Sequence, residues 1–488
     1  MHTRAFLVWV VFFFATTVVR AVPASAFPFS FGPRYSSASD TTLRALLACP
    51  GYTTLRVSGL VFVGNEVTKE RILRAELDFS EGDSLDAATL ADRIEANRLR
   101  LFNLQLFHQV LCEVACQDGN ITVLFSVKER WYTFPVPILS IADRNFRAWA
   151  DGSDRWRRVD YGVHLTRKNF RGRNENLLAN LQLGFNRKYE LFYEAPGYGR
   201  RRRVGVGIGI SYYRARALDY ATLKDRLVTF RPQDGSPIER RYITAGLRWR
   251  KTVRLLAAFD VSYHQEAVSD SVNYLNPDYY LGRTSREYLD FSLSSVLNQR
   301  NTFAYPLTGR YAQAQVVYRR FLTPAPPQLL VRARYARYVP LGKQFYYSGA
   351  VQGQVRFSQH LSYADNRALG YDVLVRGYDP YVVEGRHYAL LQQGVSYRLF
   401  DLGQVQLEGI DNPKVNTIPL ALYLNTFTDA GYVCTPSALA SNRLPNRLLA
   451  SAGVAMHLVT YYDRVFTLEY TRTLLGQGGF FFRSQFPI

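Results

Sequence analysis

The sequence predicts a transmembrane antiparallel β-barrel of sixteen strands, preceded by one small α+β module. Many segments alternate apolar and polar residues over about ten positions, the pattern of a strand with one face to lipid and one to a polar lumen. Aromatic residues are abundant, with 34 Tyr and 31 Phe among 488 residues, and they suit both strands and membrane interfaces. After the N-terminal region, no apolar run approaches the roughly 20 residues of a spanning helix.

The first 26 residues are typical of a secretory signal peptide. A nearly unbroken apolar run extends from Ala5 to Val19, and the small residues Ala24, Ser25 and Ala26 follow it. This layout predicts cleavage after Ala26 and export from the cytoplasm. Residues 27–52 are interpreted as an N-terminal segment that precedes the first folded module.

Export decides how the charge is interpreted. A formal net charge of +20 would suggest nucleic acid as a partner of a cytosolic protein. We expect no nucleic acid here, because the chain is exported and its arginines are scattered rather than gathered in one basic domain. The expected counter-charges are anionic lipid, lipopolysaccharide or acidic segments of a protein partner.

Four cysteines are present: Cys49, Cys112, Cys116 and Cys434. If Cys112 and Cys116 lie on one strand they are about 13 Å apart, too far to bridge each other. A bridge from Cys49 to one of them stays open. The chain has no CxxC pair and its seven His are dispersed, so we expect neither a metal site nor a cofactor.

The module over residues 53–131 begins with a strand and a short helix. The segment "TLRVSGLVFVGN" predicts a strand that ends at a turn of Gly64 and Asn65. The segment "TKERILRAEL" predicts a short helix with Thr68 as its cap.

A second helix and a hairpin complete the module. The helix is predicted to begin at Asp86, with Leu85 and Leu90 placed to form a hydrophobic staple. Leu90, Ile94 and Leu101 then recur at helical spacing. The segments "FHQVLCEVA" and "NITVLFSVKER" predict a hairpin that turns at residues 118–120.

Beyond this module, residues 132–156 are interpreted as an extended linker, because Pro135 and Pro137 interrupt the pattern. The barrel is assigned to residues 157–488. Its sixteen expected strands are 159–168, 175–186, 187–196, 203–216, 222–231, 239–251, 254–267, 286–299, 310–322, 329–340, 344–358, 387–400, 416–433, 447–460, 465–475 and 478–486.

The connections predict which end of the barrel is which. With a periplasmic N-terminus, odd-to-even connections face outward and should be the longer ones, as residues 268–285, 359–386 and 434–446 are. Even-to-odd connections such as "GFNRKY" at 184–189 and "VPLGK" at 339–343 are mostly short. The long segment 359–386, between the eleventh and twelfth strands, is the sixth outward loop.

The N-terminal module resembles a POTRA domain. The resemblance rests on its order of strand, helix, helix, strand and strand, on Gly64 and Asn65 after the first strand, and on Glu129 and Arg130 closing the last one. POTRA domains dock extended polypeptides, so the resemblance implies capture of a client by its main chain at a strand edge. A small domain that serves only as a spacer is the simpler alternative.

The sixth loop carries Val375, Arg376, Gly377 and Tyr378, and this run resembles the V-R-G-F/Y signature of the BamA/TamA-type outer-membrane assembly and translocation superfamily. The resemblance implies a loop folded back into the lumen, with its Arg bonded to the inner wall.

The expected partner motif is F-x-D-x-G, matched by Phe427, Asp429 and Gly431. Alternation turns Asp429 inward, so an ion pair with Arg376 is predicted. Family members often add an acidic ligand from the twelfth strand, where this sequence offers Ser396 or Gln393.

The resemblance implies a bacterial outer-membrane protein with its POTRA domain in the periplasm, which assists insertion or translocation of other outer-membrane or surface polypeptides. In that mechanism the barrel seam receives the client strand, and accessory lipoproteins can take part. The alternative is a passive pore or a structural barrel with a vestigial docking domain. We expect no catalysis: His264 and His457 fall on lumen faces, but the chain has no G-x-S-x-G elbow.

Overall fold

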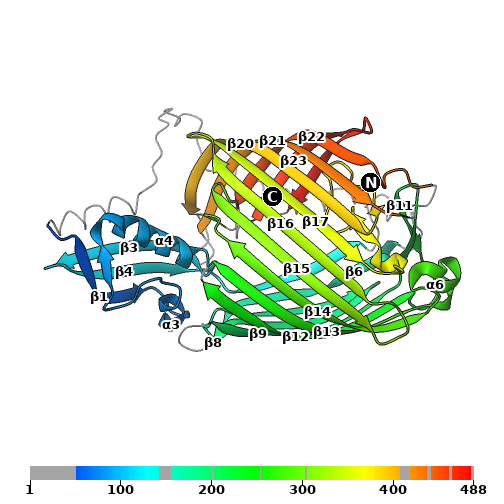
Figure 1. Cartoon of the computed structure of the whole chain (residues 1–488), viewed down its shortest axis with the longest axis horizontal. Helices are drawn as coiled ribbons and strands as arrows, with labels where there is room; N and C mark the ends of the chain where they lie inside the picture. Colours follow the sequence, from blue (N-terminus) through cyan, green and yellow to red (C-terminus); the bar gives the residue numbers. More distant parts are fainter. Residues whose placement is uncertain are drawn as a thin grey trace.

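The computed structural model describes residues 51–141, 155–198, 203–252, 254–302, 305–406, 417–436, 441–460 and 464–484. The predicted signal peptide, residues 27–50 and residues 142–154 of the predicted linker lie outside this part of the chain. A small N-terminal domain adjoins one end of a large barrel (Figure 1).

The N-terminal domain is a four-stranded sheet covered by helices. Its sheet has the order β2-β1-β4-β3, in which β1 and β4 are parallel and the other pairs are antiparallel. In chain order the elements are β1 (Thr54–Val63), α3 (Glu70–Arg74), β2 (Ser84–Asp86), η1 (Ala87–Thr89), α4 (Leu90–Phe102), β3 (Phe107–Gln117) and β4 (Asn120–Glu129).

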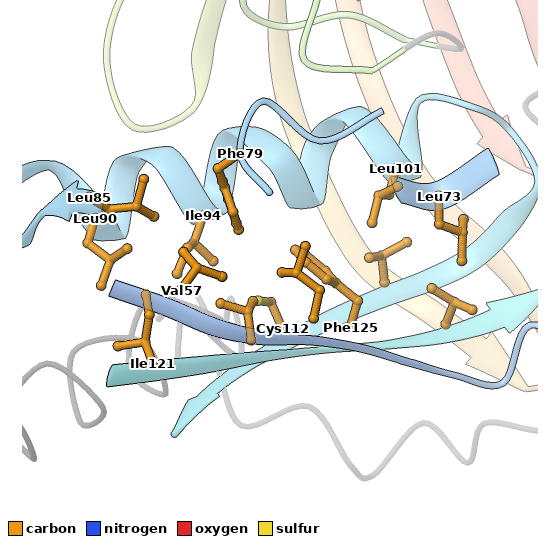
Figure 2. Close-up of a cluster of buried hydrophobic side chains, with 14 of the residues drawn as sticks. Val57, Leu73, Phe79, Leu85, Leu90, Ile94, Leu101, Cys112, Ile121 and Phe125 are labelled. Carbon is orange, nitrogen blue, oxygen red and sulfur yellow. The ribbon is translucent and has the colours of Figure 1, made fainter. Parts of the chain in front are cut away.

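One hydrophobic core holds this domain together. Leu90, Ile94 and Leu101 lie on one side of α4, as their spacing predicts, and all three are buried. Figure 2 shows them directed at strand residues that include Val57 and Phe125. Burial of these side chains provides most of the domain's stability, at about 25 cal/mol per Å² of apolar surface removed from water.

Two helix starts differ from the sequence prediction. The N-cap of α3 is Lys69, and no side chain caps it, so the assignment of Thr68 as the cap is wrong. The helix predicted from Asp86 is preceded by a 3-10 turn. Asp86 caps that turn by accepting from the Ala88 N–H, and α4 begins only at Leu90.

The structure answers part of the question of which cysteines form a disulfide. Cys116 is disulfide-bonded, whereas Cys112 and Cys434 are free thiols. Cys112 is buried in the domain core, and burial raises its pKa to about 12.

The barrel is a sixteen-stranded antiparallel sheet in which neighbours in the sheet follow chain order. Its strands are β5 (Thr133–Ile141), β6 (Val159–Phe170), β7 (Glu175–Gly184), β8 (Arg187–Tyr198), β9 (Val204–Ala215), β12 (Ile238–Thr252), β13 (Leu255–Val268), β14 (Ser285–Asn298), β15 (Gly309–Phe321), β16 (Gln328–Pro340), β17 (Phe345–Phe357), β20 (His387–Gln406), β21 (Thr417–Cys434), β22 (Leu448–Thr460), β23 (Arg464–Thr473) and β24 (Gly478–Ser484).

Two strand assignments from the sequence are wrong. One adds a strand to the barrel and the other removes one, so the predicted total of sixteen is unchanged. Thr133–Ile141, assigned to the linker, is the first barrel strand and pairs with β6. Pro135 and Pro137 are tolerated because β5 lies at a sheet edge. The expected strand at 222–231 instead lies in a two-stranded hairpin of β10 (Leu218–Leu223) and β11 (Arg226–Phe230), outside the barrel sheet.

The end of the barrel away from the N-terminal domain carries the longer connections (Figure 1). They include β11 and the short helix α6 (Asp270–Leu275), which is followed by η3 (Pro277–Tyr279). Because β5 is the first strand, "GFNRKY" at 184–189 joins the third and fourth strands. It therefore lies at this far end, and its predicted placement on the N-terminal side is wrong.

The alternating pattern separates an apolar outer face of the strands from a polar inner face, as predicted. Val351 and Phe357 of β17 are exposed on the outer surface, while Gln352 and Gln354 of the same strand line an internal cavity. In the part of the chain that the structure describes, no helix is both long and apolar enough to cross a membrane.

Candidate functional site

The sixth loop connects β17 to β20 and folds back inside the barrel. It contains a 3-10 turn, η4 (Tyr363–Asp365), and a two-stranded ribbon of β18 (Arg367–Leu369) and β19 (Val383–Glu384). Val375 at its inner part packs in a buried cluster with Leu390 of β20 and Val433 of β21. A loop of this length is held inside by side-chain contacts to the wall, and two sets of contacts provide them.

The first set joins Arg376 to Asp429 of β21, as the two sequence motifs predict. Arg376 Nε donates to Asp429 Oδ2 at 2.9 Å, and its Nη2 donates to Oδ1. The Arg376 backbone N–H also donates to Oδ2 at 3.0 Å. The Asp429 side chain is fully buried and that of Arg376 is 11% exposed. The contact is a bidentate, charge-assisted pair, the strongest class of protein hydrogen bond.

Phe427 and Gly431 shape the wall around this pair. The Arg376 guanidinium lies 3.7 Å from the centre of the Phe427 ring, a cation–π contact in a site removed from water. A Cβ at Gly431 would lie 2.6 Å from Cγ2 of Val375, so only glycine leaves room for the loop. All three partner-motif residues therefore contact the signature or make space for it.

Gly377 and Tyr378 complete the signature. Gly377 has φ +85°, and a Cβ there would lie 2.8 Å from Thr471 and 2.9 Å from Thr473, both at Cγ2. The glycine is required for its backbone conformation and for close approach to β23. The Tyr378 hydroxyl donates to the Ala450 carbonyl at 3.3 Å, so the loop also bonds to β22.

The twelfth strand contributes a residue that the sequence prediction missed. Gln392 Nε2 donates to Asp429 Oδ2 at 3.2 Å. The two residues that the sequence offered form their described hydrogen bonds elsewhere: Ser396 bonds to Tyr305 and Asn425, and Gln393 bonds to Tyr347 and Thr428. Alternation on β20 could have identified Gln392. It precedes Ser396 by four positions and therefore lies on the same face of the strand.

A second ion pair joins this part of the loop to the last strand. Asp379, directly after the signature, accepts from Arg483 of β24 at 2.9 Å. Arg483 also donates to Glu469 of β23 at 2.8 Å. The inner part of the loop is thus bonded to β21, β22 and β24.

The second set of contacts lies on the opposite part of the sheet and was not predicted. Asp365, in η4, accepts from Arg286 of β14 at 2.7 Å and from Arg319 of β15 at 2.8 Å. Gln328 of β16 and Ser362 also donate to it. Burial opposes ionisation of this carboxyl, but the two guanidiniums hold the pKa of Asp365 well below its usual range.

Each of these two arginines also has a carboxylate partner on the wall. Arg286 Nε donates to Glu266 of β13 at 2.8 Å. Arg319 forms two bonds of 2.8 Å to Asp290 of β14. The sequence contains no motif that joins residues of four strands with one loop, so alternation alone could mark them only as facing the lumen.

The predicted turn and closing pair of the N-terminal domain lie together. Gly64 has φ +88°, and a Cβ there would lie 2.0 Å from the Val127 carbonyl oxygen. Asn65 donates to the Thr68 carbonyl at 3.1 Å, and the buried Glu129 accepts from the Thr68 N–H at 2.7 Å. Arg130 donates to the Phe107 carbonyl at 2.8 Å. Gly64, Asn65 and Glu129 thus shape the loop between β1 and α3, and Arg130 joins the end of β4 to β3.

That loop is also where the domain contacts the barrel. Asn169 of β6 donates to the Thr68 hydroxyl at 2.8 Å, and the Lys69 N–H donates to the Gly172 carbonyl at 2.9 Å. Farther around the rim, the fully buried Glu76 forms an ion pair with Arg250 of β12. The N-terminal domain is therefore joined to the barrel at several separate points, which include the bond from Asn103 to the Asn301 carbonyl at 3.2 Å.

Comparisons with known proteins agree with this architecture. Residues 55–130 match the POTRA family "Surface antigen variable number repeat", and residues 169–460 match the "Omp85 superfamily domain". No curated protein matches.

Among solved structures, the chain is similar to BamA from Haemophilus ducreyi lacking POTRA domains 1–3. The identity is 16% and the TM-score 0.50, over 88% of this chain and 83% of that one. It is also similar to CdiB from Escherichia coli, with 13% identity and a TM-score of 0.50 over 88% of this chain and 76% of that one. These likenesses concern the fold. The superfamily match covers more than half of the chain, and with its POTRA domain and sixteen-stranded barrel the protein belongs to the Omp85 superfamily.

Proposed function

We propose that this protein assists insertion or translocation of other polypeptides at the bacterial outer membrane, with its POTRA domain in the periplasm. Membership of the Omp85 superfamily and the likeness of the barrel to that of BamA support this proposal. The observation that carries it is a pair of open strand edges, one in the POTRA domain and one at the barrel seam. An open edge can bind an extended client through main-chain hydrogen bonds.

The POTRA edge is the outer side of β3. This strand ends the order β2-β1-β4-β3, so its second side has no strand partner among the described residues. One carbonyl, that of Val110, accepts from Arg98 at 3.3 Å. The neighbouring Glu113 is exposed. An edge of eleven residues is long enough for a client strand of ordinary length, about five or six residues.

The seam lies between β5 and β24, which end the barrel sheet on its two sides and are not joined by any described pairing. The Tyr132 carbonyl accepts from the Lys168 N–H, so these two residues form a bonded pair just before β5. Bonded and non-bonded pairs alternate along antiparallel strands. Pro135 and Pro137 therefore fall at non-bonded positions, where their backbone groups face away from β6 and towards the seam. Proline has no N–H to donate, so β5 lacks two seam donors.

The same alternation leaves the amides of Gly478, Phe480 and Phe482 facing the seam from β24, because the Thr473 N–H donates to the Gln477 carbonyl. The edge of β24 therefore keeps its N–H donors, whereas the edge of β5 lacks two of them. Continuous hydrogen bonding between β5 and β24 is weakened as a result. A weakly closed seam is the property that a path from lumen to bilayer requires.

We propose that this function involves no catalysis. His457 bonds to the Tyr305 hydroxyl at 3.0 Å, and His264 is stacked between Tyr242 and Tyr288. Both contacts are those of structural side chains.

Depletion of the protein tests the function. The abundance of other outer-membrane or surface proteins should fall, as quantitative proteomics of isolated outer membranes would measure. Unchanged levels across that proteome would favour the alternative of a passive pore or structural barrel.

Photo-crosslinking tests the site of capture. A photo-crosslinking amino acid at Glu113 on the β3 edge should trap client polypeptides in living cells. The same group at Asp92, exposed on α4, is the matched control. Equal yields at both positions would contradict capture at the edge.

A further inference from the structure

An arginine cluster on the lumen wall is not used by either set of loop contacts. It consists of Arg332 and Arg334 on β16 and Arg356 on β17, and all three line one cavity of about 780 Å³. A cavity of this size is in the usual range of ligand sites. Six arginines and four aspartates line it, so the wall carries an excess of positive charge.

The cluster differs in its partners from Arg248 and Arg319, two other arginines that line this cavity. Arg248 pairs with Asp260 at 2.7 Å, and Arg319 pairs with two aspartates. Within the described residues, no ion pair involves Arg332, Arg334 or Arg356. The wall positions opposite Arg332 and Arg334 are neutral amides.

The strand register explains the lack of carboxylates. Arg332 lies opposite Gln315 on β15 and Gln354 on β17, and Arg334 lies opposite Gln313 and Gln352 on the same two strands. Glutamine cannot neutralise a guanidinium, although Arg332 Nε donates to the Gln354 amide oxygen at 2.9 Å.

Arg356 gives an independent indication of a ligand. The residue is only 8% exposed, and its Nε and Nη1 atoms are buried without a hydrogen-bond partner, as is Nε of Arg334. Buried donors without an acceptor are costly, and more so when they are charged. A ligand that brings oxyanion groups would satisfy them.

We propose that this cluster binds an acidic polypeptide segment in extended conformation, with carboxylates at alternate positions. This inference rests on the proposed function, which brings client polypeptides to the barrel. Arg332 and Arg334 are two residues apart on one strand face, about 6.6 Å along the strand. Alternate side chains of an extended client have the same spacing, so successive carboxylates match successive guanidiniums.

Loop six carries one carboxylate into the same place. Asp372 is exposed and lines the cavity. It is the only aspartate of the lining with no ion pair among the described residues. The cavity therefore already accommodates an acidic side chain of an irregular segment.

The test uses the full chain in phosphatidylcholine nanodiscs at low salt. A fluorescent peptide with Glu and Ser alternating should bind, as measured by anisotropy. The variant Arg332→Gln/Arg334→Gln should lower its affinity by about tenfold or more, because two charge-assisted contacts are lost. Arg337→Gln, on the opposite face of β16, is the matched control and should leave the affinity unchanged. Equal affinity of the wild type and the double variant would overturn the proposal.

Two further arms use only the wild-type protein, so they do not depend on the folding of a variant. A peptide of equal charge with its Glu residues in one contiguous block should bind more weakly, and equal binding would contradict the spacing argument. Binding of inorganic phosphate without binding of either peptide would assign the cluster to free phosphate and overturn the peptide proposal. Peptide binding together with an unchanged outer-membrane proteome after depletion would reject the proposed function but keep the site.

Discussion

Two parts of loop six are tied to the barrel in different ways. Near the seam, Asp429 is the carboxylate that pairs with Arg376. Halfway around the sheet, Asp365 is shared by two arginines, each of which has another carboxylate on the wall. The first tie is a pair whose loss leaves a buried charge alone, whereas the second is a network in which each cation has a second partner. Stability of the loop should therefore depend more steeply on the first.

The largest effect is expected from Asp429→Ala. It leaves the Arg376 guanidinium, whose side chain is only 11% exposed, without its carboxylate. The free energy of unfolding should fall by about 3 to 5 kcal/mol. Denaturant unfolding in detergent micelles measures this, and heat-modifiable electrophoretic mobility gives a second readout. Thr428→Ala, one position away on the outer face, is the control.

A double-mutant cycle examines the pair itself. Arg376→Ala combined with Asp429→Ala should cost less than the sum of the two single variants, because the second substitution removes a charge that the first leaves unpaired. Strict additivity would mean that the two side chains do not interact in the folded barrel.

A smaller effect is expected from Asp365→Ala, about 1 to 3 kcal/mol. Arg286 keeps Glu266 and Arg319 keeps Asp290, so neither cation is left alone. The same unfolding measurement applies, with Asp372→Ala as the control on the same loop. A loss as large as that of Asp429→Ala would contradict the distinction between a pair and a network.

The pH dependence sharpens this comparison. The pKa of Asp365 is lowered in the folded state, so its stabilisation is present above the unfolded value of about 4 and is lost as the pH falls below it. The stability difference between wild type and Asp365→Ala should stay constant from about pH 7 to 5 and shrink towards pH 3. A difference that does not change with pH would show that the charge of Asp365 is not what holds the loop.

The seam between β5 and β24 can be strengthened by restoring the missing N–H donors of β5. Pro135→Val/Pro137→Val returns two N–H groups to the open edge of β5. If β24 provides acceptors for both, the gain is about 0.5 to 1.5 kcal/mol for each bond. Thermal unfolding should shift upward, and client insertion should slow. Thr133→Val, on the same edge with its N–H already present, is the control; an unchanged midpoint in the double variant would mean that the seam does not pair there.

The smallest effect is expected from Asp379→Asn. Its ion pair with Arg483 is partly exposed, at 27% and 15% of the side chains, and Arg483 keeps Glu469. The expected loss is about 0.2 to 1 kcal/mol, measured against wild type in the same unfolding experiment. A loss above that of Asp365→Ala would assign the seam strands a greater share of the loop's stability than the geometry indicates.

The sequence by itself determined features that depend on local residue patterns or on a recognisable motif. Two-residue periodicity identified the strand faces because successive side chains of a strand point to opposite sides. The signature at Arg376 and the motif at Asp429 predicted a contact over 53 positions, since each motif carries a fixed part of one interaction. Most elements of the POTRA domain followed from helical spacing and turn residues.

Only the tertiary structure decided the roles that depend on a distant partner. Pro135 and Pro137 argue against a strand until the sheet places them on its edge, where the missing N–H groups have no ladder to break. The segment at 222–231 has the composition of a barrel strand but pairs with its own neighbour. The network at Asp365 joins η4 to four strands, and no local pattern encodes such a meeting, because it exists only once the barrel has closed around the loop.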